Sequence, residues 1–197
     1  MTNAPSSQLS PIYLRGATPA AGAALRAMLS RCTAETLRAR FLAATAPTEA
    51  DELVELVGDM SSTTGLELYL NAAVRNRENA TVLAWHEGQV LAAGSIFPVC
   101  HGIGEIALIV EDRWQGKGIG SLMTNALAEV ATLAKLDCLC AYLDVNNVRA
   151  RKLITRFCPR AKFLHPEAGV VDVVIPIAAL SFEVPDPPRV DSARKRS

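Results

Sequence analysis

The chain has 197 residues, and its 20 basic and 20 acidic side chains give a formal net charge of zero at pH 7. This balance excludes a protein that uses overall charge to bind nucleic acid or a membrane surface. Half of the residues are hydrophobic, which suffices for the core of one domain. No apolar run approaches the roughly 20 residues that span a bilayer. We therefore expect a cytoplasmic protein without nucleic-acid or membrane partners.

The composition predicts one domain at residues 12–180 with a loose segment on each side. Residues 1–11 are polar and lack the basic region of a signal peptide, so they predict a flexible arm. Residues 181–197 combine prolines with a basic run and predict a disordered tail.

The first half of the domain is expected to be mainly helical after an opening strand at residues 12–15. Thr18 fits the N-cap of a helix with Pro19 in its first turn. The segments that follow are helices at 34–42 and from Thr48 onward, a loop at 61–65, and a stretch at 66–75 that fits helix and strand equally.

The second half alternates strands with helices. Residues 86–89 join two strands as a hairpin. The predicted strands are 81–85, 90–98, 106–110, 139–145 and 170–175, and a long helix is predicted at 121–135. This order predicts an α/β (α+β) fold, in which helices cover both faces of a mixed sheet.

The five cysteines are scattered, and their odd number and apolar neighbours predict reduced thiols in the core. Cys138 and Cys140 would share one face of a strand. A zinc site needs closely spaced cysteine or histidine partners, and none occur here, so we expect no metal.

The most informative segment joins the strand at 106–110 to the helix at 121–135. Three glycines, Gly116, Gly118 and Gly120, lie between them. A strand, a glycine loop and a helix in this order direct main-chain N–H groups and a helix N-terminus at one point, which suits a phosphate group.

Two common phosphate motifs do not fit this segment. A Walker loop requires glycine where Glu111 stands and Ser or Thr where Gly118 stands. The dinucleotide pattern G-x-G-x-x-[GA] fits residues 102–107, but these precede a strand instead of opening a helix. The pattern that remains is Q-x-x-G-x-G, formed by Gln115, Gly118 and Gly120.

This pattern resembles motif A, [RQ]-x-x-G-x-[GA], of the GNAT family of N-acetyltransferases. The resemblance implies a mixed, mostly antiparallel sheet and acetyl-coenzyme A as cofactor. It implies that the loop amides hold the pyrophosphate and that the preceding strand pairs with the pantetheine arm. The cofactor-binding residues would then be Leu108, Ile109, Val110, Gln115, Gly116, Lys117, Gly118, Ile119, Gly120 and Ser121.

A second stretch is similar to the family pattern N-x-x-A-x-x-L-Y. Asn147, Ala150 and Leu153 match it, and the resemblance implies that Asn147 touches the cofactor. Ile154 replaces the tyrosine that often serves as general acid. Cys158 and Pro159 replace the Gly-Phe that usually ends this helix.

A narrower resemblance is to bacterial protein-lysine acetyltransferases of the Pat type. Residues 29–41 are similar to their L-S-x-x-[ST]-x-x-x-R-F region, and residues 104–110 to their A-E-[FI]-A-[VL]-x-V strand. The catalytic base of those enzymes falls on Glu105. A base is useful because a lysine amine, with a pKa of about 10.4, is almost entirely charged at neutral pH.

Other polar and aromatic residues near the motif have structural interpretations. We expect Glu111 and Asp112 to be turn residues, Trp114 to cover the core, and Lys117 to be either a phosphate contact or a solvated lysine. His101 is a weaker site candidate, and Tyr142 is the nearest substitute for the missing tyrosine. His86 and His165 are expected to be structural.

The leading hypothesis is an N-acetyltransferase that moves an acetyl group to a primary amine, on a protein lysine or a small molecule, by direct attack with Glu105 as base. One alternative is a catalytically degenerate domain that binds coenzyme A as a sensor or scaffold. Another is a nucleotide-binding module, which would be competed by ATP. A homodimer remains open.

Overall fold

The structure is a computed structural model, and it describes residues 11–41, 73 and 79–180. The helix expected from Thr48, the loop at 61–65, the ambiguous stretch at 66–75 apart from the helical Ala73, and both terminal segments lie outside the described residues.

Within the described residues, the strands form one seven-stranded sheet in the order β1-β2-β3-β4-β5-β7-β6. All neighbours are antiparallel except β4 and β5. The strands are β1 (Tyr13–Gly16), β2 (Ala80–His86), β3 (Gln89–Cys100), β4 (Ile103–Val110), β5 (Cys138–Asp144), β6 (Lys162–Phe163) and β7 (Val170–Pro176). The expected mixed, mostly antiparallel sheet is confirmed.

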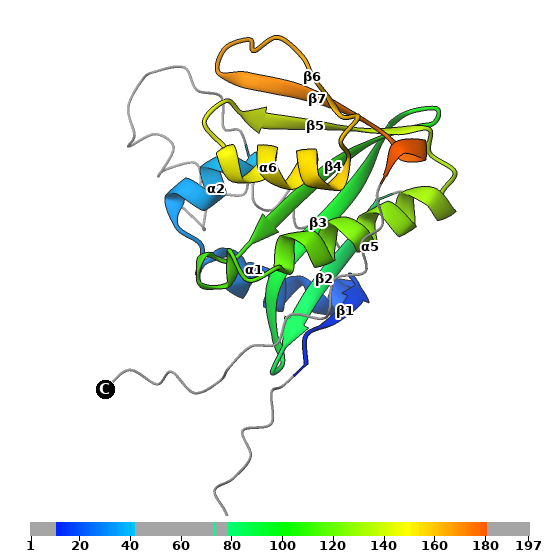
Figure 1. Cartoon of the computed structure of the whole chain (residues 1–197). Coiled ribbons are helices and arrows are strands. Elements are labelled where there is room, and N and C mark those ends of the chain that lie inside the picture. Colours follow the sequence, from blue (N-terminus) through cyan, green and yellow to red (C-terminus); the bar gives the residue numbers. More distant parts are fainter. Residues whose placement is uncertain (1–10, 42–72, 74–78, 181–197) are drawn as a thin grey trace, which may run out of the picture.

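Helices cover both faces of this sheet (Figure 1). The helices α1 (Gly22–Leu29) and α2 (Ala34–Phe41) contact β3 and β4, while α5 (Ile119–Leu133) packs on β2, β3 and β4 and also against α6 (Val148–Phe157). In Figure 1, α5 and α6 lie in front of the sheet and α1 lies behind it. Short 3-10 segments occur at η1 (Pro19–Ala21), η2 (Asp112–Trp114) and η3 (Ile177–Ala179).

The alternation of side chains along β4 produces a separate core on each face of the sheet. Ile109 is buried with Leu25, Met28 and Leu29 of α1. Its neighbours Leu108 and Val110 instead pack against the cluster that contains Met123 of α5. Side chains at odd positions of β4 therefore face α1, and those at even positions face α5.

Beyond Glu105, β4 and β5 are not paired with each other. The parallel pairing joins only three residues of β4 to β5, and its last pair is Glu105 with Cys140. β4 continues along β3 as far as Val110, while β5 continues along β7 as far as Asp144. The two strands consequently diverge toward their carboxyl ends (Figure 1).

Several element boundaries differ from the predictions. β4 begins at Ile103, so Glu105 lies inside the strand and not at its start. The hairpin between β2 and β3 contains only Glu87 and Gly88, both with positive φ, because such a two-residue turn matches the twist of the strands. Thr18 precedes a 3-10 segment and makes no side-chain capping bond. The short strand β6 was not predicted.

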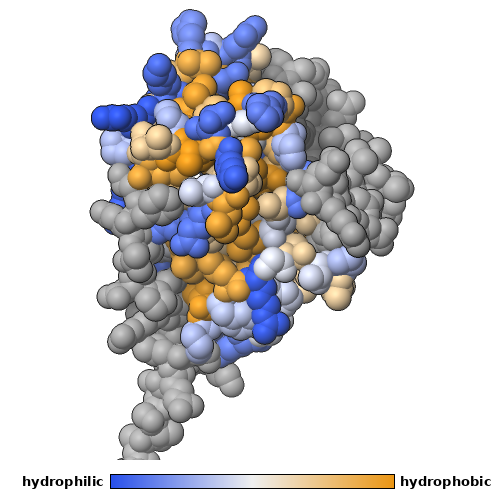
Figure 2. Space-filling view, turned by 90° about the vertical axis from the view of Figure 1, so that its right-hand side faces the viewer, coloured by the Kyte–Doolittle hydropathy of each residue, from blue (hydrophilic) through white to orange (hydrophobic). Residues whose placement is uncertain are grey.

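Hydrophobic side chains also gather on the side of the molecule where α5 ends. Figure 2 shows an apolar band crossing this side between more polar margins. Leu133, at the end of α5, is 83% exposed, and Val99, near the end of β3, is 54% exposed. The homodimer considered from the sequence remains a prediction.

Candidate active site

Glu105 stands where β4 and β5 part, on the face of the sheet opposite α5 and α6. It is half-buried and lies beside Phe97 of β3 and Cys140 of β5 in the strand register. Tyr142, two residues along β5, is 42% exposed on the same face and lies opposite Asp172 of β7. Glu105 is therefore in a position to meet a molecule that approaches this face.

The main chain of β4 presents alternate residues to the gap between β4 and β5. The N–H of Glu111 bonds to the carbonyl oxygen of Leu91 on β3, and Val110 is the residue opposite Ala92. In this antiparallel pattern Ile109 bonds to β3, while the N–H and C=O groups of Leu108 and Val110 point the other way.

The expectation that Ile109 binds a cofactor through its main chain is therefore corrected. Its main-chain groups are directed to β3, and its side chain is only 2% exposed in the core beneath α1. Leu108 and Val110 keep the predicted orientation, since their polar main-chain groups face the gap.

The glycine loop turns the chain from β4 into α5. Gly118 is the N-cap of α5 with φ 82°, and Gly116 has φ 72°. Glycine adopts these left-handed conformations without the steric cost that a Cβ atom brings. Since Gly118 has no side chain to cap the helix, the first N–H groups of α5, on Ile119, Gly120 and Ser121, are directed out of the helix end. This geometry suits the pyrophosphate of coenzyme A.

Gln115 holds the loop in place through its side chain. Its Nε2 donates to the carbonyl oxygen of Val110 and to Thr36 Oγ1, each at 3.0 Å. Its Oε1 accepts a bond from Arg149 of α6. The side chain of Gln115 is thus engaged by the protein, so its contribution to a phosphate site would come from the main chain.

Thr36 and Arg149 were not identified from the sequence. Their bonds to Gln115 link residues 79 and 34 positions apart in the chain. No local pattern marks such contacts, because they depend on how α2 and α6 are placed by the sheet.

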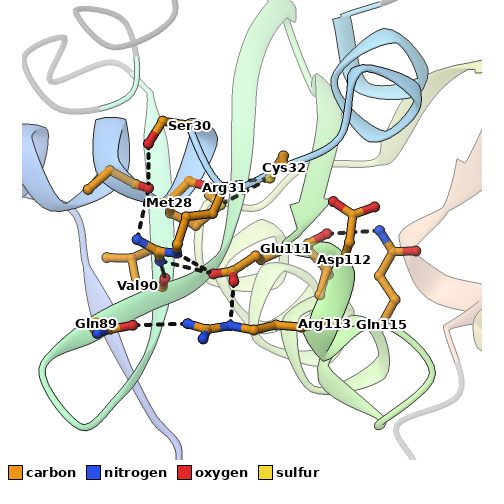
Figure 3. A network of polar contacts seen from close by, with 12 residues as sticks. Met28, Ser30, Arg31, Cys32, Gln89, Val90, Glu111, Asp112, Arg113 and Gln115 are labelled. Carbon is orange, nitrogen blue, oxygen red and sulfur yellow. Dashed lines mark hydrogen bonds and ion pairs between the residues drawn. The ribbon is translucent and has the colours of Figure 1, made fainter. Parts of the chain in front are cut away.

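Glu111 anchors the end of β4 to α1 and β3 (Figure 3). Its side chain is 3% exposed and accepts a hydrogen bond from Arg31 Nε at 3.0 Å, and Arg31 Nη2 forms an ion pair with the same carboxylate oxygen at 2.9 Å. Arg113 pairs with its other oxygen, and Arg31 Nη2 also donates to the carbonyl oxygen of Val90. A carboxylate buried this deeply requires such partners. These contacts support the expectation that Glu111 has a structural role at the turn after β4.

Asp112 ties the same corner to the start of α2. It accepts bonds from the Thr33 main-chain N–H and hydroxyl, both at 2.8 Å, and from the Thr36 hydroxyl at 2.7 Å. Burial acts to raise the pKa of Asp112, but these hydrogen bonds outweigh it and the pKa is lowered. Asp112 is therefore held as a carboxylate and secures α2, as its interpretation as a turn residue implies.

Trp114 lies over the core, as expected, with 7% exposure. Its ring packs edge-on against His86, at 5.1 Å between ring centroids. Lys117 places its ammonium group 4.9 Å from the centre of the same ring. Lys117 is consequently positioned by Trp114 at the outer side of the glycine loop.

The two sequence motifs meet between α5 and α6. A Cβ atom at Gly120 would lie 3.3 Å from Leu153 Cδ2, so glycine permits this close approach. Asn147 is the N-cap of α6, and its Oδ1 accepts the N–H of Ala150 at 3.0 Å. If Asn147 contacts the cofactor as predicted, it would do so through its side-chain NH₂ group, because Oδ1 is used by Ala150.

Ile154, which replaces the family tyrosine, is 8% exposed and packs in the core between α6 and the sheet. Tyr142 instead stands on the face of Glu105, two residues along β5 from Cys140. The neighbouring Cys140, burial and the carboxylates of Glu105 and Asp172 raise the pKa of Tyr142. Tyr142 therefore keeps its proton at neutral pH.

The remaining candidates from the sequence are spread over the fold. His101 is exposed in the turn between β3 and β4, away from the gap at the carboxyl end of β4. All five cysteines are free, but the expectation of core thiols is wrong for Cys100, which is exposed because it lies at the end of β3; Cys158 alone is buried. Cys138 and Cys140 share a face, as predicted.

Within the described ranges, no group of three or more His, Cys, Asp or Glu side chains is arranged to hold a metal ion. No helix in that part of the chain is both long and apolar enough to cross a membrane.

Comparison with known proteins identifies the family. The acetyltransferase (GNAT) family model matches residues 41–158, more than half of the chain. No curated protein matches the sequence.

Three solved structures with this fold align with 83–88% of the residues of this chain. The GNAT domain of S. lividans PAT has 17% identity, a TM-score of 0.63 and 89% of its chain covered. PaiA N-acetyltransferase from Thermoplasma acidophilum, solved in complex with coenzyme A, has 12% identity, a TM-score of 0.63 and 98% covered.

The third is the ribosomal-protein-S18-alanine N-acetyltransferase from Escherichia coli, with 10% identity, a TM-score of 0.59 and 97% of its chain covered. At these identities the similarity concerns the fold, and the family model supplies the assignment. The parted strands and the glycine loop fit the cofactor of that family. The chain belongs to the acetyltransferase (GNAT) family, and it is an N-acetyltransferase whose cofactor is acetyl-coenzyme A.

Proposed function

We propose that the chain transfers the acetyl group to a primary amine, on a protein lysine or a small molecule, with Glu105 as the general base. The observation that carries this proposal is the place of Glu105 at the last pair between β4 and β5, on the face opposite α5 and α6. A base in this position reaches an amine on one face of the sheet while the gap beside it holds the thioester.

The roles of the chain's groups follow from this arrangement. Glu105 would take a proton from the ammonium of the acceptor, which is almost fully charged at neutral pH, and the neutral amine would then attack the thioester carbonyl. The N–H of Val110, directed into the gap, would stabilise the oxyanion that forms on the acetyl carbonyl. The glycine loop would hold the pyrophosphate through main-chain N–H groups.

Tyr142 is the candidate that would return a proton to the departing thiolate. Its raised pKa favours the neutral phenol, which has a proton to give. Its exposed position on the face of Glu105 supports this role, whereas the buried Ile154 has no proton to give.

The main test compares Glu105→Gln with Glu129→Gln, which makes the same charge change at an exposed position on α5. Glu105→Gln should lower kcat by roughly 10²–10⁴-fold, the usual loss for a general base. The affinity for coenzyme A should be unchanged, and the defect should shrink at high pH, where the free amine is already neutral. An unaltered rate at neutral pH would eliminate Glu105 as base.

The competing function is a domain that binds coenzyme A without turning it over, which the buried Ile154 favours. Release of free thiol with a panel of amines separates the two, because a sensor would bind the cofactor and release none. Mass spectrometry on separate protein and metabolite pools would then identify the acceptor class.

A further inference from the structure

We propose that the acceptor is a short aliphatic diamine, and that Asp172 holds one of its ammonium groups while the other end is acetylated. The inference rests on the proposed function, because it requires the amine site beside Glu105. It gives a specificity-determining role to Asp172, which the proposed mechanism does not use.

Asp172 and Glu105 are on the same face of the sheet, with β5 between them (Figure 1). Asp172 of β7 lies opposite Tyr142 of β5, and Cys140, two residues earlier on β5, lies opposite Glu105 of β4. Alternate residues of a strand point to the same side, so these side chains all face away from α5 and α6. Tyr142 therefore stands between two carboxylates.

The phenol of Tyr142 responds to both of these charges. Cys140 and burial are the larger causes of its raised pKa, and the carboxylates of Glu105 and Asp172 contribute as well. A molecule that lies across Tyr142 consequently has an acidic group at each end. The ring, which is 42% exposed, offers an apolar surface to a methylene chain between these groups.

Asp172 is available for a cation. Its side chain is exposed, and among the described residues it belongs to no ion pair. Lys162, which β6 adds to this face opposite Val174, does not pair with it. Asp144, the other carboxylate that β5 places on this face, already accepts the N–H of Asn146. Asp172 is thus the carboxylate that can bind a second ammonium group.

The register sets the length of a molecule that reaches both carboxylates. Two strand spacings of about 4.8 Å and two residues of about 3.3 Å separate Glu105 from Asp172, which gives about 12 Å between their Cα atoms. Two contacts of about 2.8 Å and a chain of four to six carbons, about 6–9 Å between its nitrogens, span this distance. A monoamine of the same length leaves Asp172 without a partner.

The reaction uses the two ends of the diamine differently. The end beside Glu105 loses a proton and attacks the thioester carbonyl, the C–S bond breaks, and coenzyme A leaves as the thiol. The other end has a pKa of about 10.4, like lysine, and remains an ammonium on Asp172. The product is an amide with one remaining charge, so a second transfer lacks the cation that Asp172 binds. The main product is therefore the monoacetyl diamine.

The experiment measures kcat/KM of the full-length chain for hexylamine and for pentane-1,5-diamine, with release of free thiol from acetyl-coenzyme A as the readout. The two amines have the same length, but a methyl group replaces the second ammonium in hexylamine. The parent should prefer the diamine by roughly five- to tenfold, more than the factor of about two that two equivalent amines supply. Added salt should narrow this preference, and mass spectrometry should find the monoacetyl product.

Asp172→Asn should reduce the preference to about the factor of two, and Asp172→Glu should restore most of it. Asp137→Asn is the matched control and should retain it, because Asp137 is exposed before β5, at the end of the strand away from the gap. Asp172 also raises the pKa of Tyr142, and its loss acts through Tyr142 on both amines alike. The ratio of the two kcat/KM values therefore reports the second cation alone.

Three results would overturn the inference. Equal kcat/KM values for the two amines would show that no second cation is recognised. A preference that persists in Asp172→Asn would place its recognition elsewhere, and an equal loss in Asp137→Asn would show a general charge effect. If the parent acetylates lysines of a protein extract but neither amine, the inference fails and the proposed function stands. If it acetylates nothing, both fail.

Discussion

Gln115 donates its side-chain amide to the carbonyl oxygen of Val110 at 3.0 Å, which joins the first residue of the glycine motif to the last residue of β4. This carbonyl points toward the gap between β4 and β5, where no strand among the described residues supplies a partner for it. The side chain therefore completes the end of the strand and fixes the start of the loop at the same time.

Replacing Gln115 by glutamate should destabilise this corner and weaken coenzyme A binding. A carboxylate cannot donate to Val110, and it places a negative charge beside the phosphate loop. Leaving this part-buried carbonyl without a partner costs about 1–2 kcal/mol, or roughly 2–8 °C in Tm for a domain of this size. Thermal unfolding and calorimetric titration measure the two effects. Gln89→Glu is the control, because Gln89 only accepts a bond from Arg113, which a carboxylate also accepts.

Gly118→Val should damage both the fold and the loop, because Gly118 has φ 82° and β-branched residues are strained in that region. The expected cost is about 1–2 kcal/mol or more, with at least a tenfold loss of coenzyme A affinity. The matched variant Gly16→Val should be well tolerated, since a Cβ at Gly16 meets nothing within 4 Å. Equal coenzyme A affinity of the parent and Gly118→Val would contradict the assignment of the loop.

Arg31 and Arg113, the two arginines that pair with Glu111, should contribute unequally to the free energy of unfolding. Arg31→Met leaves a buried carboxylate without two of its bonds and should cost about 2–4 kcal/mol in the free energy of unfolding. Arg113→Met removes a side chain that is 54% exposed and should cost less than 1 kcal/mol. Urea unfolding of both variants gives the comparison. A similar cost for the two would mean that burial of Glu111 does not depend on Arg31.

The thiol of Cys32 should resist alkylation in the folded protein. Burial first, and then the charges of Asp112 and Glu111, raise its pKa from 9.0 to about 12. Because the folded state holds this proton more tightly, its stabilising contribution is complete below pH 9 and is lost as the pH rises toward 12. Timed labelling with iodoacetamide at pH 8, read by mass spectrometry, should modify the exposed Cys100 first. Early labelling of Cys32 would refute the prediction.

The local patterns of the sequence were sufficient to locate the strands and helices that bury one face in the core. The strand at 106–110 and the helix at 121–135 were located within three residues, because apolar side chains repeat there with the period of a strand and of a helix. The two residues of β6 are too few to display any period. The central glycine loop was found because its backbone conformation requires glycine.

The surroundings of the site could not be predicted, since they depend on contacts between distant segments. Asp112 binds Thr33 and Thr36 across 76 or more positions in the chain. The point at which β4 and β5 separate is set by the pairing of each strand with its other neighbour. The alternation that turns Ile109 away from the gap follows from that pairing and not from the identity of the residue.

The separation of β4 and β5 also has a consequence for the protein without its cofactor. Beyond Glu105, each strand carries a row of main-chain donors and acceptors that its sheet neighbour on that side does not satisfy. Such a row is a template for pairing with another extended chain, which is the usual start of aggregation. The pantetheine arm would occupy this template when it binds. Bound coenzyme A would then protect the folded chain from pairing of this kind, in addition to supplying the acetyl group.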